Sequence, residues 1–302
     1  MATIQEQKFG VEIEIAGVAR HTIAEAVAEA VEGRITATHD YGYDATVVTD
    51  PQGREWKIQN DGSIAIVQGH RGSEIVTPIL TWEDIPLLKQ VIRQVKATGA
   101  IPHRSGSIHV HADGRQHTPK SLSILAKMVY KNEDMIFDAL KVLPERRRRY
   151  TQPMDNEFID KVAKRRPKSY KKLNEFYFGR YTPHPQHYSS ERYKGLNLVN
   201  LWRDICTIEM RYFNASLNPN KIIAYVHLCL ALSTKALNAH AASHRKIPTD
   251  NPKFNFRVWL VATLGMKGNE FKTTRYYLTR NLPGNSAWRY GRPTTSQRAT
   301  TS

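Results

Sequence analysis

Cysteine is scarce in this chain of 302 residues, which contains only Cys206 and Cys229. The two residues form no CxxC pair, and each lies in a periodic apolar segment, where cysteine is usually a small buried residue. A disulfide framework is therefore not indicated. This usage suits a reducing compartment, and we expect a cytoplasmic protein.

Long apolar runs are missing as well. The longest, VHLCLAL at residues 226–232, is far shorter than the roughly 20 residues that a membrane-spanning helix needs. The first ten residues, MATIQEQKFG, contain no apolar stretch of the kind found in signal peptides. The sequence predicts neither a membrane span nor a signal peptide, and no membrane partner.

Common phosphate-binding loops are also absent. No segment matches the P-loop pattern GxxxxGK[ST], the dinucleotide pattern GxGxxG or a kinase glycine-rich loop, and there is no internal repeat. If this chain binds ATP, it does so through another architecture.

Acidic residues are few relative to basic ones, 28 against 44, which gives a formal net charge of +16. Such an excess favours an anionic partner, such as a nucleotide, a nucleic acid or an acidic peptide. Much of it lies in a basic, partly helical insert at about residues 144–190, with RRRRY at 146–150 and KRRPKSYKK at 164–172. The insert is either a solvated surface, a wall that collects an anionic substrate, or a nucleic-acid contact that uses Tyr150, Tyr170, Tyr177 and Tyr181.

Strand and helix patterns are mixed without one-for-one alternation. Strands are predicted at 8–15, 73–80, 107–113, 196–200 and 206–213, with a hairpin at 44–60 that turns at DPQG. Helices are predicted at 22–32, from the Thr81 cap to 97, at 118–142 and 219–243, and twice between 253 and 281. The pattern predicts one α+β domain over residues 1–290, with a largely antiparallel sheet, and a disordered tail at 291–302.

Three of the predicted strands share an unusual alternation. In FGVEIEI the apolar residues occupy the odd positions from 9 to 15, so Glu12 and Glu14 share the opposite face, with Cα atoms roughly 6.6 Å apart at about 3.3 Å per residue. In SIHVHAD, His109, His111 and Asp113 share one face, and in TIEMRYF the corresponding face carries Thr207, Glu209, Arg211 and Phe213. Strands joined in one sheet would thus have an apolar back and an ionisable front.

The chemistry of such a front indicates bound cations. Neighbouring carboxylates repel one another unless cations lie between them. Oxygen ligands with an occasional imidazole suit Mg²⁺ or Mn²⁺ better than structural zinc, and Arg211 could either pair with Glu209 or reach a phosphate. Each motif alone has an ordinary explanation: a solvated E-x-E, a surface histidine pair, or a turn at DGS, residues 61–63. Together they favour a metal-dependent site that handles phosphate.

Several short motifs, in order and in register, resemble the amidoligase family. They are FGVEIEI, DGSI followed by GSEIVTPIL, SGSIHVHAD, YKGLNL, TIEMRYFNASLNPNKI and LPGNSAWRYG. That family is similar to the carboxylate–amine ligases of the glutamine synthetase and glutamate–cysteine ligase superfamily. The resemblance runs from about residue 8 to residue 290 and is weakest in the insert.

The resemblance implies a glutamine-synthetase-like curved sheet whose concave face holds ATP and two or three divalent cations, Mg²⁺ or Mn²⁺, with helices packed on the back. Glu12 and Glu14 would bind different ions. Glu74 would join Glu14, whereas His109 and Glu209 would join Glu12. The chain departs from the family pattern at one point. Relatives often have a glycine directly before the strand that holds H-x-H, whereas here Gly106 lies three residues before His109, so the approach of the chain to that strand differs.

Other roles follow from the same resemblance. Arg211 would contact the transferring phosphoryl group, and Asp61 would be a further ligand or bind the amine. Contacts with the nucleotide or a substrate are implied for His111, Ser63, Lys194 and Asn197, and His111 and Asn197 could instead support the metal ligands.

The implied reaction forms an amide in two steps. A substrate carboxylate attacks the γ-phosphate of ATP to give an acyl phosphate and ADP, and an amine then displaces phosphate. The partners would be a small-molecule or peptide carboxylate and an amine. Two alternatives remain open at this point: a metal-dependent hydrolase that uses His109 and His111, and a basic nucleic-acid-binding protein without catalytic activity.

Overall fold

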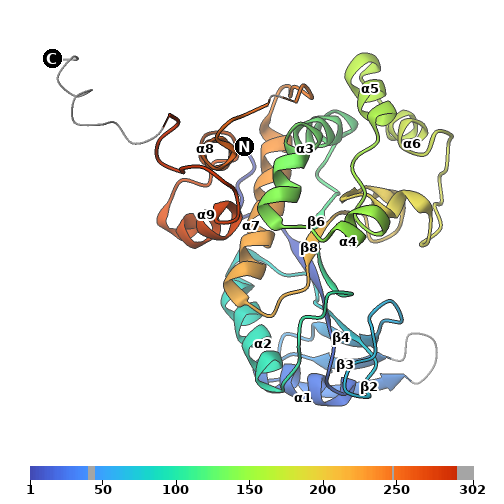
Figure 1. Ribbon diagram of the computed structural model, residues 1–302. Helices are drawn as coiled ribbons and strands as arrows, with labels where there is room; N and C mark the ends of the chain where they lie inside the picture. Colours follow the sequence, from blue (N-terminus) through green and yellow to red (C-terminus); the bar gives the residue numbers. More distant parts are fainter. Residues whose placement is uncertain (40–44, 247, 291–302) are drawn as a thin grey trace, which may run out of the picture.

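A computed structural model describes residues 1–39, 45–246 and 248–290 of the chain (Figure 1). The tail predicted at 291–302 lies outside the described residues. Among the described helices, none combines the length and the apolar composition needed to cross a bilayer.

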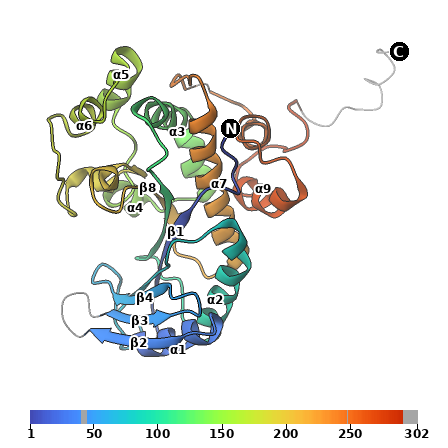
Figure 2. The same cartoon turned by 180° about the vertical axis from the view of Figure 1, so that it is seen from behind.

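The centre of the molecule is an antiparallel sheet of eight strands within the described residues, ordered β2-β3-β4-β5-β1-β6-β8-β7. The strands are β1 (Phe9–Ile15), β2 (Arg34–His39), β3 (Ala45–Thr49), β4 (Glu55–Asn60), β5 (Ser73–Val76), β6 (Ser107–Asp113), β7 (Leu196–Asn197) and β8 (Thr207–Asn214). The sheet twists strongly, so that β2–β4 run across the direction of β1 (Figure 2). The predicted α+β class with a large antiparallel sheet is confirmed.

Helices cover one face of this sheet. The described helices are α1 (Arg20–Ala30), α2 (Ile85–Ala97), α3 (Pro119–Leu140), α4 (Pro144–Arg149), α5 (Asn156–Arg165), α6 (Tyr170–Phe178), α7 (Pro219–Asn238), α8 (Pro252–Val258) and α9 (Lys272–Thr279). Helix α1 packs on β3 and β4, whereas α7 packs on β1 and β6 and also contacts α2, α3 and α9. Helices α4–α6 lie on the side of the β8 region away from α7, where α5 packs on α3 and α6 (Figures 1 and 2).

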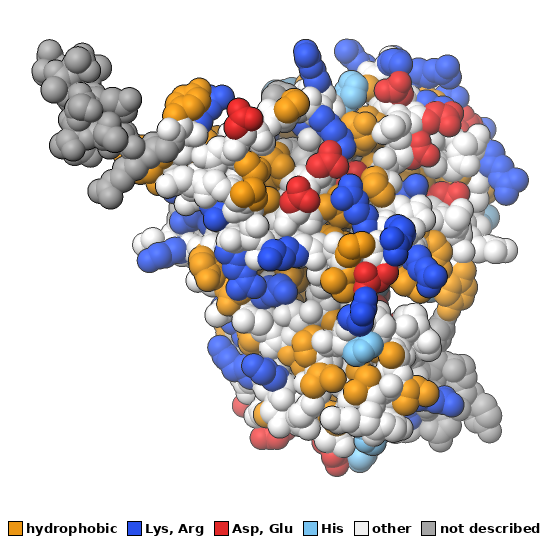
Figure 3. Space-filling model, in the orientation of Figure 1, with side chains coloured by type: hydrophobic (Ala, Val, Ile, Leu, Met, Phe, Trp, Pro, Cys, Tyr) orange, Lys and Arg blue, Asp and Glu red, His pale blue; other side chains and the backbone are white. Residues whose placement is uncertain are grey.

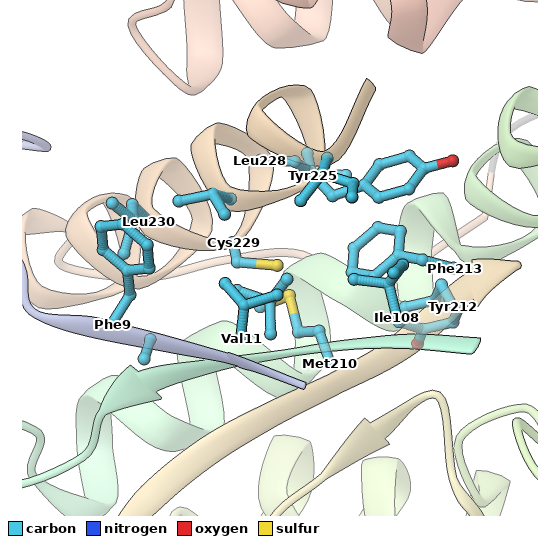
Figure 4. Packing of buried hydrophobic residues seen from close by; sticks show 14 of the residues in the cluster. Phe9, Val11, Ile108, Met210, Tyr212, Phe213, Tyr225, Leu228, Cys229 and Leu230 are labelled. Carbon is cyan, nitrogen blue, oxygen red and sulfur yellow. The ribbon is translucent and has the colours of Figure 1, made fainter. Parts of the chain in front are cut away.

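The apolar face of the central strands packs against α7. Phe9 and Val11 of β1 lie under Leu228, Cys229 and Leu230 of the helix, as Figure 4 shows. Each such side chain stabilises the fold by about 1.5–3 kcal/mol on burial. Helix α7 begins after Asn218, whose side chain accepts a hydrogen bond from Lys221 N, with Pro219 at the first helical position. The core therefore leaves the opposite, carboxylate-bearing face of the sheet free for a site.

Several element boundaries differ from the prediction. Strand β2 was missed, although it pairs with β3 at the sheet edge. Strand β5 ends at Val76 instead of residue 80, because Pro78 has no N–H to donate to a ladder. Helix α1 begins two residues earlier than predicted and has no side-chain cap. Cys229 is buried as expected, but Cys206 is only partly buried and lies in a turn with φ of 44°.

A bulge in β8 changes the face of one predicted site residue. The register shifts between Ile108, which lies opposite Phe213, and Val110, which lies opposite Met210. Phe213 therefore joins the apolar face and stacks on Tyr225 of α7, with ring centroids 4.2 Å apart (Figure 4). The prediction that Phe213 shares the face of Glu209 and Arg211 is wrong, because strict alternation fails at a bulge.

Glu133 of α3 is a fully buried carboxyl group that links three segments. It accepts hydrogen bonds from Tyr212 Oη at 2.7 Å and from Met154 N at 3.1 Å. Burial raises its pKa from the ordinary 4.5 to about 7, against the opposing effect of these two donors. The folded protein therefore keeps a proton that the unfolded chain releases, and the free energy of unfolding should fall as pH rises from about 4.5 to about 7.

We expect Glu133→Gln to flatten this pH dependence, because the amide does not ionise. Urea unfolding at pH 5 and pH 7.5 measures it: the wild type should lose more stability between the two pH values than the variant. Glu25→Gln, on the exposed part of α1, is the control and should behave as the wild type. Equal slopes in the wild type and Glu133→Gln would contradict the assignment.

Candidate active site

Glu12 lies between two imidazoles at the centre of the sheet. Because β1 pairs with β6, Glu12 is directly opposite His109 in register. Its carboxylate oxygens lie 2.8 Å from His109 Nδ1 and 3.1 Å from His111 Nε2. Burial opposes ionisation of Glu12, but the two imidazoles outweigh it and hold its pKa well below the usual range. Glu12 thus joins both histidines of the H-x-H motif.

A second acidic group forms on the other side of β1. Glu14 is opposite Glu74 of β5, and Gln59 of β4 donates to Glu74 Oε2 at 2.7 Å. Asp61 follows β4 directly, and oxygens of Glu14, Asp61 and Glu74 all lie within 4.8 Å of one another. Burial, and then the charges of Glu12 and Glu14, raises the pKa of Glu74 well above its usual range.

Glu209 and Arg211 of β8 complete the charged face. Glu209 accepts a hydrogen bond from Asn197 Nδ2 at 2.6 Å and another from Arg211 Nη1. Although burial favours its neutral form, the Arg211, His111 and His109 side chains lower the pKa of Glu209 to about 2. Arg211 Nε in turn donates to the Tyr150 carbonyl at 3.2 Å, so the residue that follows α4 helps to orient this guanidinium.

These side chains form three groups that could each hold a cation. The groups are Glu12–His111–Glu209, Glu12–Glu74–His109 and Glu14–Asp61–Glu74. Glu14 Oε2 is buried without a hydrogen-bond partner among the described residues, and a cation would satisfy it. His111 Nε2 also lacks a hydrogen bond in correct geometry despite its 3.1 Å distance from Glu12 Oε1. Oxygen ligands with single imidazoles fit Mg²⁺ or Mn²⁺.

The acidic face forms the floor of a cavity of about 680 Å³. Asn60, the last residue of β4, lines one end of the cavity, together with Asp61 and Ser63, which follow the strand. The roof comes from both ends of the insert and the segment after it: Tyr150, His187, Tyr188, Arg192, Tyr193 and Arg203. Of the possibilities left open for the insert, a wall of the site is the one that the structure supports at these positions.

Comparison with known proteins identifies the family. The sequence model of a family described as "Putative amidoligase enzyme" matches residues 5–233, well over half of the chain. The chain belongs to the amidoligase family. No curated protein matches it with significant similarity. Family membership points to a ligase-type enzyme that forms amide bonds, in agreement with the resemblance seen in the motifs.

The predicted ligands of this amidoligase-family protein lie in overlapping groups. Glu14 and Glu74 lie together, with Asp61. His111 lies with Glu12 and Glu209 in one group, and His109 lies with Glu12 and Glu74 in another. His109 Nδ1 also lies 2.8 Å from Glu12 Oε2 and 3.5 Å from Glu209 Oε1, so the grouping implied by the resemblance stays a prediction. H-x-H spacing alone could not show that both imidazoles lie near Glu12 and Glu209, because this depends on the register of β6 with β1 and β8.

The remaining residues expected at the site divide into two sets. Ser63 lines the cavity, and its backbone N–H donates to Asp61 Oδ1 at 2.7 Å. Asn197 is buried beside Glu209. Lys194 lies elsewhere, against a separate cavity of about 370 Å³ bounded by α5 and α6, so the structure does not bring it to the acidic floor. Gly106 lies against Glu14, whose carbonyl oxygen would be 3.2 Å from an added Cβ.

Sequence reasoning missed the roof residues His187, Arg192 and Arg203. They follow no strand or helix period, since they lie in the irregular segment TPHPQHYSSERY and after β7. Their one signal is composition, because the segment TPHPQHYSSERY is rich in histidine and tyrosine and contains an arginine. Only the fold of the chain over the sheet places them opposite Glu12.

Proposed function

We propose that this protein is an ATP-dependent carboxylate–amine ligase that works through an acyl phosphate and uses two or three divalent cations, Mg²⁺ or Mn²⁺. In this proposal the twisted sheet is the concave, glutamine-synthetase-like platform of the superfamily. The carboxylate is a small molecule or the side chain of a peptide, and the amine is its partner.

The observation that carries the proposal is the crowding of buried carboxylates on one sheet face. Glu14, Glu74 and Glu209 are each less than a tenth exposed, and Glu14 Oε2 has no partner among the described residues. Such a set is unfavourable without cations, which supports metal binding. Bound cations would neutralise the repulsion between the triphosphate and the incoming carboxylate.

The protein side chains supply the remaining steps. Arg211, held by Glu209 and the Tyr150 carbonyl, would stabilise the charge on the transferring phosphoryl group. The second step needs a base that takes the ammonium proton before the amine attacks. Glu74 and Asp61, which lie together beside Glu14, are the two candidates for this base. No protein nucleophile is required, since the phosphate activates the acyl carbon.

The two alternatives receive less support. A two-histidine hydrolase site needs His109 and His111 around one ion, and none of the three groups formed by the described residues contains both. A nucleic-acid surface would gather cations in one stripe, whereas Lys and Arg side chains are spread over much of the face in Figure 3.

ADP release tests the proposal. The purified protein is incubated with ATP, Mg²⁺ and a panel of amine and carboxylate pairs, and ADP is measured by a coupled assay. We expect release that needs both substrates and stops with EDTA. ADP release without an amine and a carboxylate, or amide formation in EDTA, would contradict the proposed reaction.

A further inference from the structure

Two arginines in the roof of the cavity face the acidic floor. Arg203 Nη1 lies 2.7 Å from His187 Nδ1 and 3.4 Å from Asn200 Oδ1. The Arg192 guanidinium lies over the rings of Tyr188 and Tyr193, at 5.3 and 5.8 Å from their centroids. Both arginines are only partly exposed.

Neither guanidinium forms an ion pair with a carboxylate of the described residues. Arg54, which is also partly buried, pairs instead with both Asp50 and Asp84. Burial, together with the charges of Arg192 and Arg203, lowers the pKa of His187, so its ring is a neutral acceptor for Arg203. Half-buried cations with only neutral and aromatic partners retain most of their capacity to bind an anion.

The position of this pair relates it to one cation group. His187, Arg192 and Arg203 also line a small recess of about 60 Å³ whose other wall carries Glu12, His111 and Glu209. An oxyanion in this recess would lie between the guanidiniums above and a cation held by Glu12, His111 and Glu209 below. Arg211 is the nearest further cation in the lining of the large cavity.

The large cavity also contains a part that the small recess does not share. Glu14, Asp61 and Glu74 line the large cavity, together with Gln59, Asn60 and Ser63, but none of them lines the recess at Arg192 and Arg203. An ammonium group fits this acidic end of the cavity, and an anion fits the arginine end at the recess.

We propose that Arg192 and Arg203 form an anion clamp that holds an oxyanion of a substrate, either a phosphoryl group of the nucleotide or the substrate carboxylate, above the Glu12–His111–Glu209 group. The clamp rests on the proposed ligase function and orients the reaction: the anionic substrate occupies the arginine end, and the amine enters past Asp61. Each guanidinium contributes charge-assisted hydrogen bonds to the anion.

Calorimetric binding of two probes, inorganic triphosphate with Mg²⁺ and succinate, tests the clamp in the full-length protein. Arg203→Gln and Arg192→Gln should each weaken binding of one probe by about tenfold to a hundredfold, the range for losing a charge-assisted hydrogen bond. If the variants lose affinity for triphosphate, the clamp holds a phosphoryl group. If they lose affinity for succinate, the clamp holds the substrate carboxylate. Arg180→Gln, an exposed change of the same charge in the same segment, should bind as the wild type.

Melting temperatures control for folding. Both variants should melt like the wild type, because no carboxylate in the described part of the chain forms an ion pair with either arginine. Loss of the contact with His187 could unfold Arg203→Gln. In that case the affinity of Arg192→Gln decides whether the clamp exists, since the described contacts of the Arg192 side chain are with aromatic rings. Unchanged affinity for both probes, or no binding of either by the wild type, overturns the clamp.

ADP release by the same proteins separates the two proposals. A wild type that binds triphosphate through these arginines but releases no ADP with any substrate pair refutes the ligase and keeps the clamp. A wild type that releases ADP, with variants that bind and turn over equally well, refutes the clamp alone.

Discussion

Glu12→Gln is expected to reduce ADP release on the order of 10³-fold, the largest loss of any single change in the site. Glu12 contributes an oxygen to two of the three groups of candidate ligands and contacts both His109 and His111. The amide keeps the size of the side chain but removes the charge, so cation binding weakens in two places at once. The charge stabilisation that phosphoryl transfer needs is lost with it.

Mn²⁺ binding, measured by electron paramagnetic resonance, checks the cause of this loss. The variant should bind at least one Mn²⁺ fewer than the wild type at equal free metal concentration. Its melting temperature without metal should fall, because the ionised Glu12, whose pKa the two imidazoles hold low, stabilises the fold and the amide does not. Glu25→Gln on α1 should match the wild type in both measurements. Full Mn²⁺ occupancy together with full activity in Glu12→Gln would refute the metal role of Glu12.

Arg146→Met is expected to lower the free energy of unfolding by roughly 2–4 kcal/mol, because each buried carbonyl left without a donor costs about 1–3 kcal/mol. Arg146 is 2% exposed, and its guanidinium donates to the carbonyls of Phe213 and Arg211 on both sides of Tyr212 in the β8 bulge. Burial, only partly opposed by Glu14, lowers its pKa to about 10, so it stays charged at neutral pH. The arginine-rich run is thus not wholly a solvated surface, which was one of the three interpretations that the sequence left open.

The same variant should also lose activity beyond its loss of stability. Arg146 is a positioning residue, since it holds the bulge from which Arg211 points to Glu209. A misplaced Arg211 should lower kcat more than it raises KM, by about 10²-fold. Added guanidinium at non-denaturing concentration should restore part of kcat. Arg148→Met, an exposed change on the same helix, is the matched control. A stable variant with unchanged kcat would show that the bulge does not need Arg146.

The local pattern of the sequence determined the central strands and their faces. Alternation in FGVEIEI and SIHVHAD correctly placed Phe9 and Val11 in the core and Glu12, Glu14 and His109 on the other face. The helix predicted at 118–142 likewise begins within one residue of the observed start of α3 at Pro119. These features depend on side-chain period and on neighbours within four residues, which are visible in the sequence itself.

Only the tertiary structure decided which of these residues meet. Strand order β5-β1-β6-β8 brings Glu74, Glu12, His109 and Glu209 side by side, and register is a long-range property that no local pattern encodes. The bulge in β8 turned Phe213 to the core, and the register of β6 with β8 set His111 opposite Glu209. Arg146, Arg192 and Arg203 are indistinguishable as basic residues in the sequence. The fold buries Arg146 beside β8, whereas Arg192 and Arg203 line a recess together with Glu12. The sequence thus determined the ionisable face, and the packing of distant segments decided its partners.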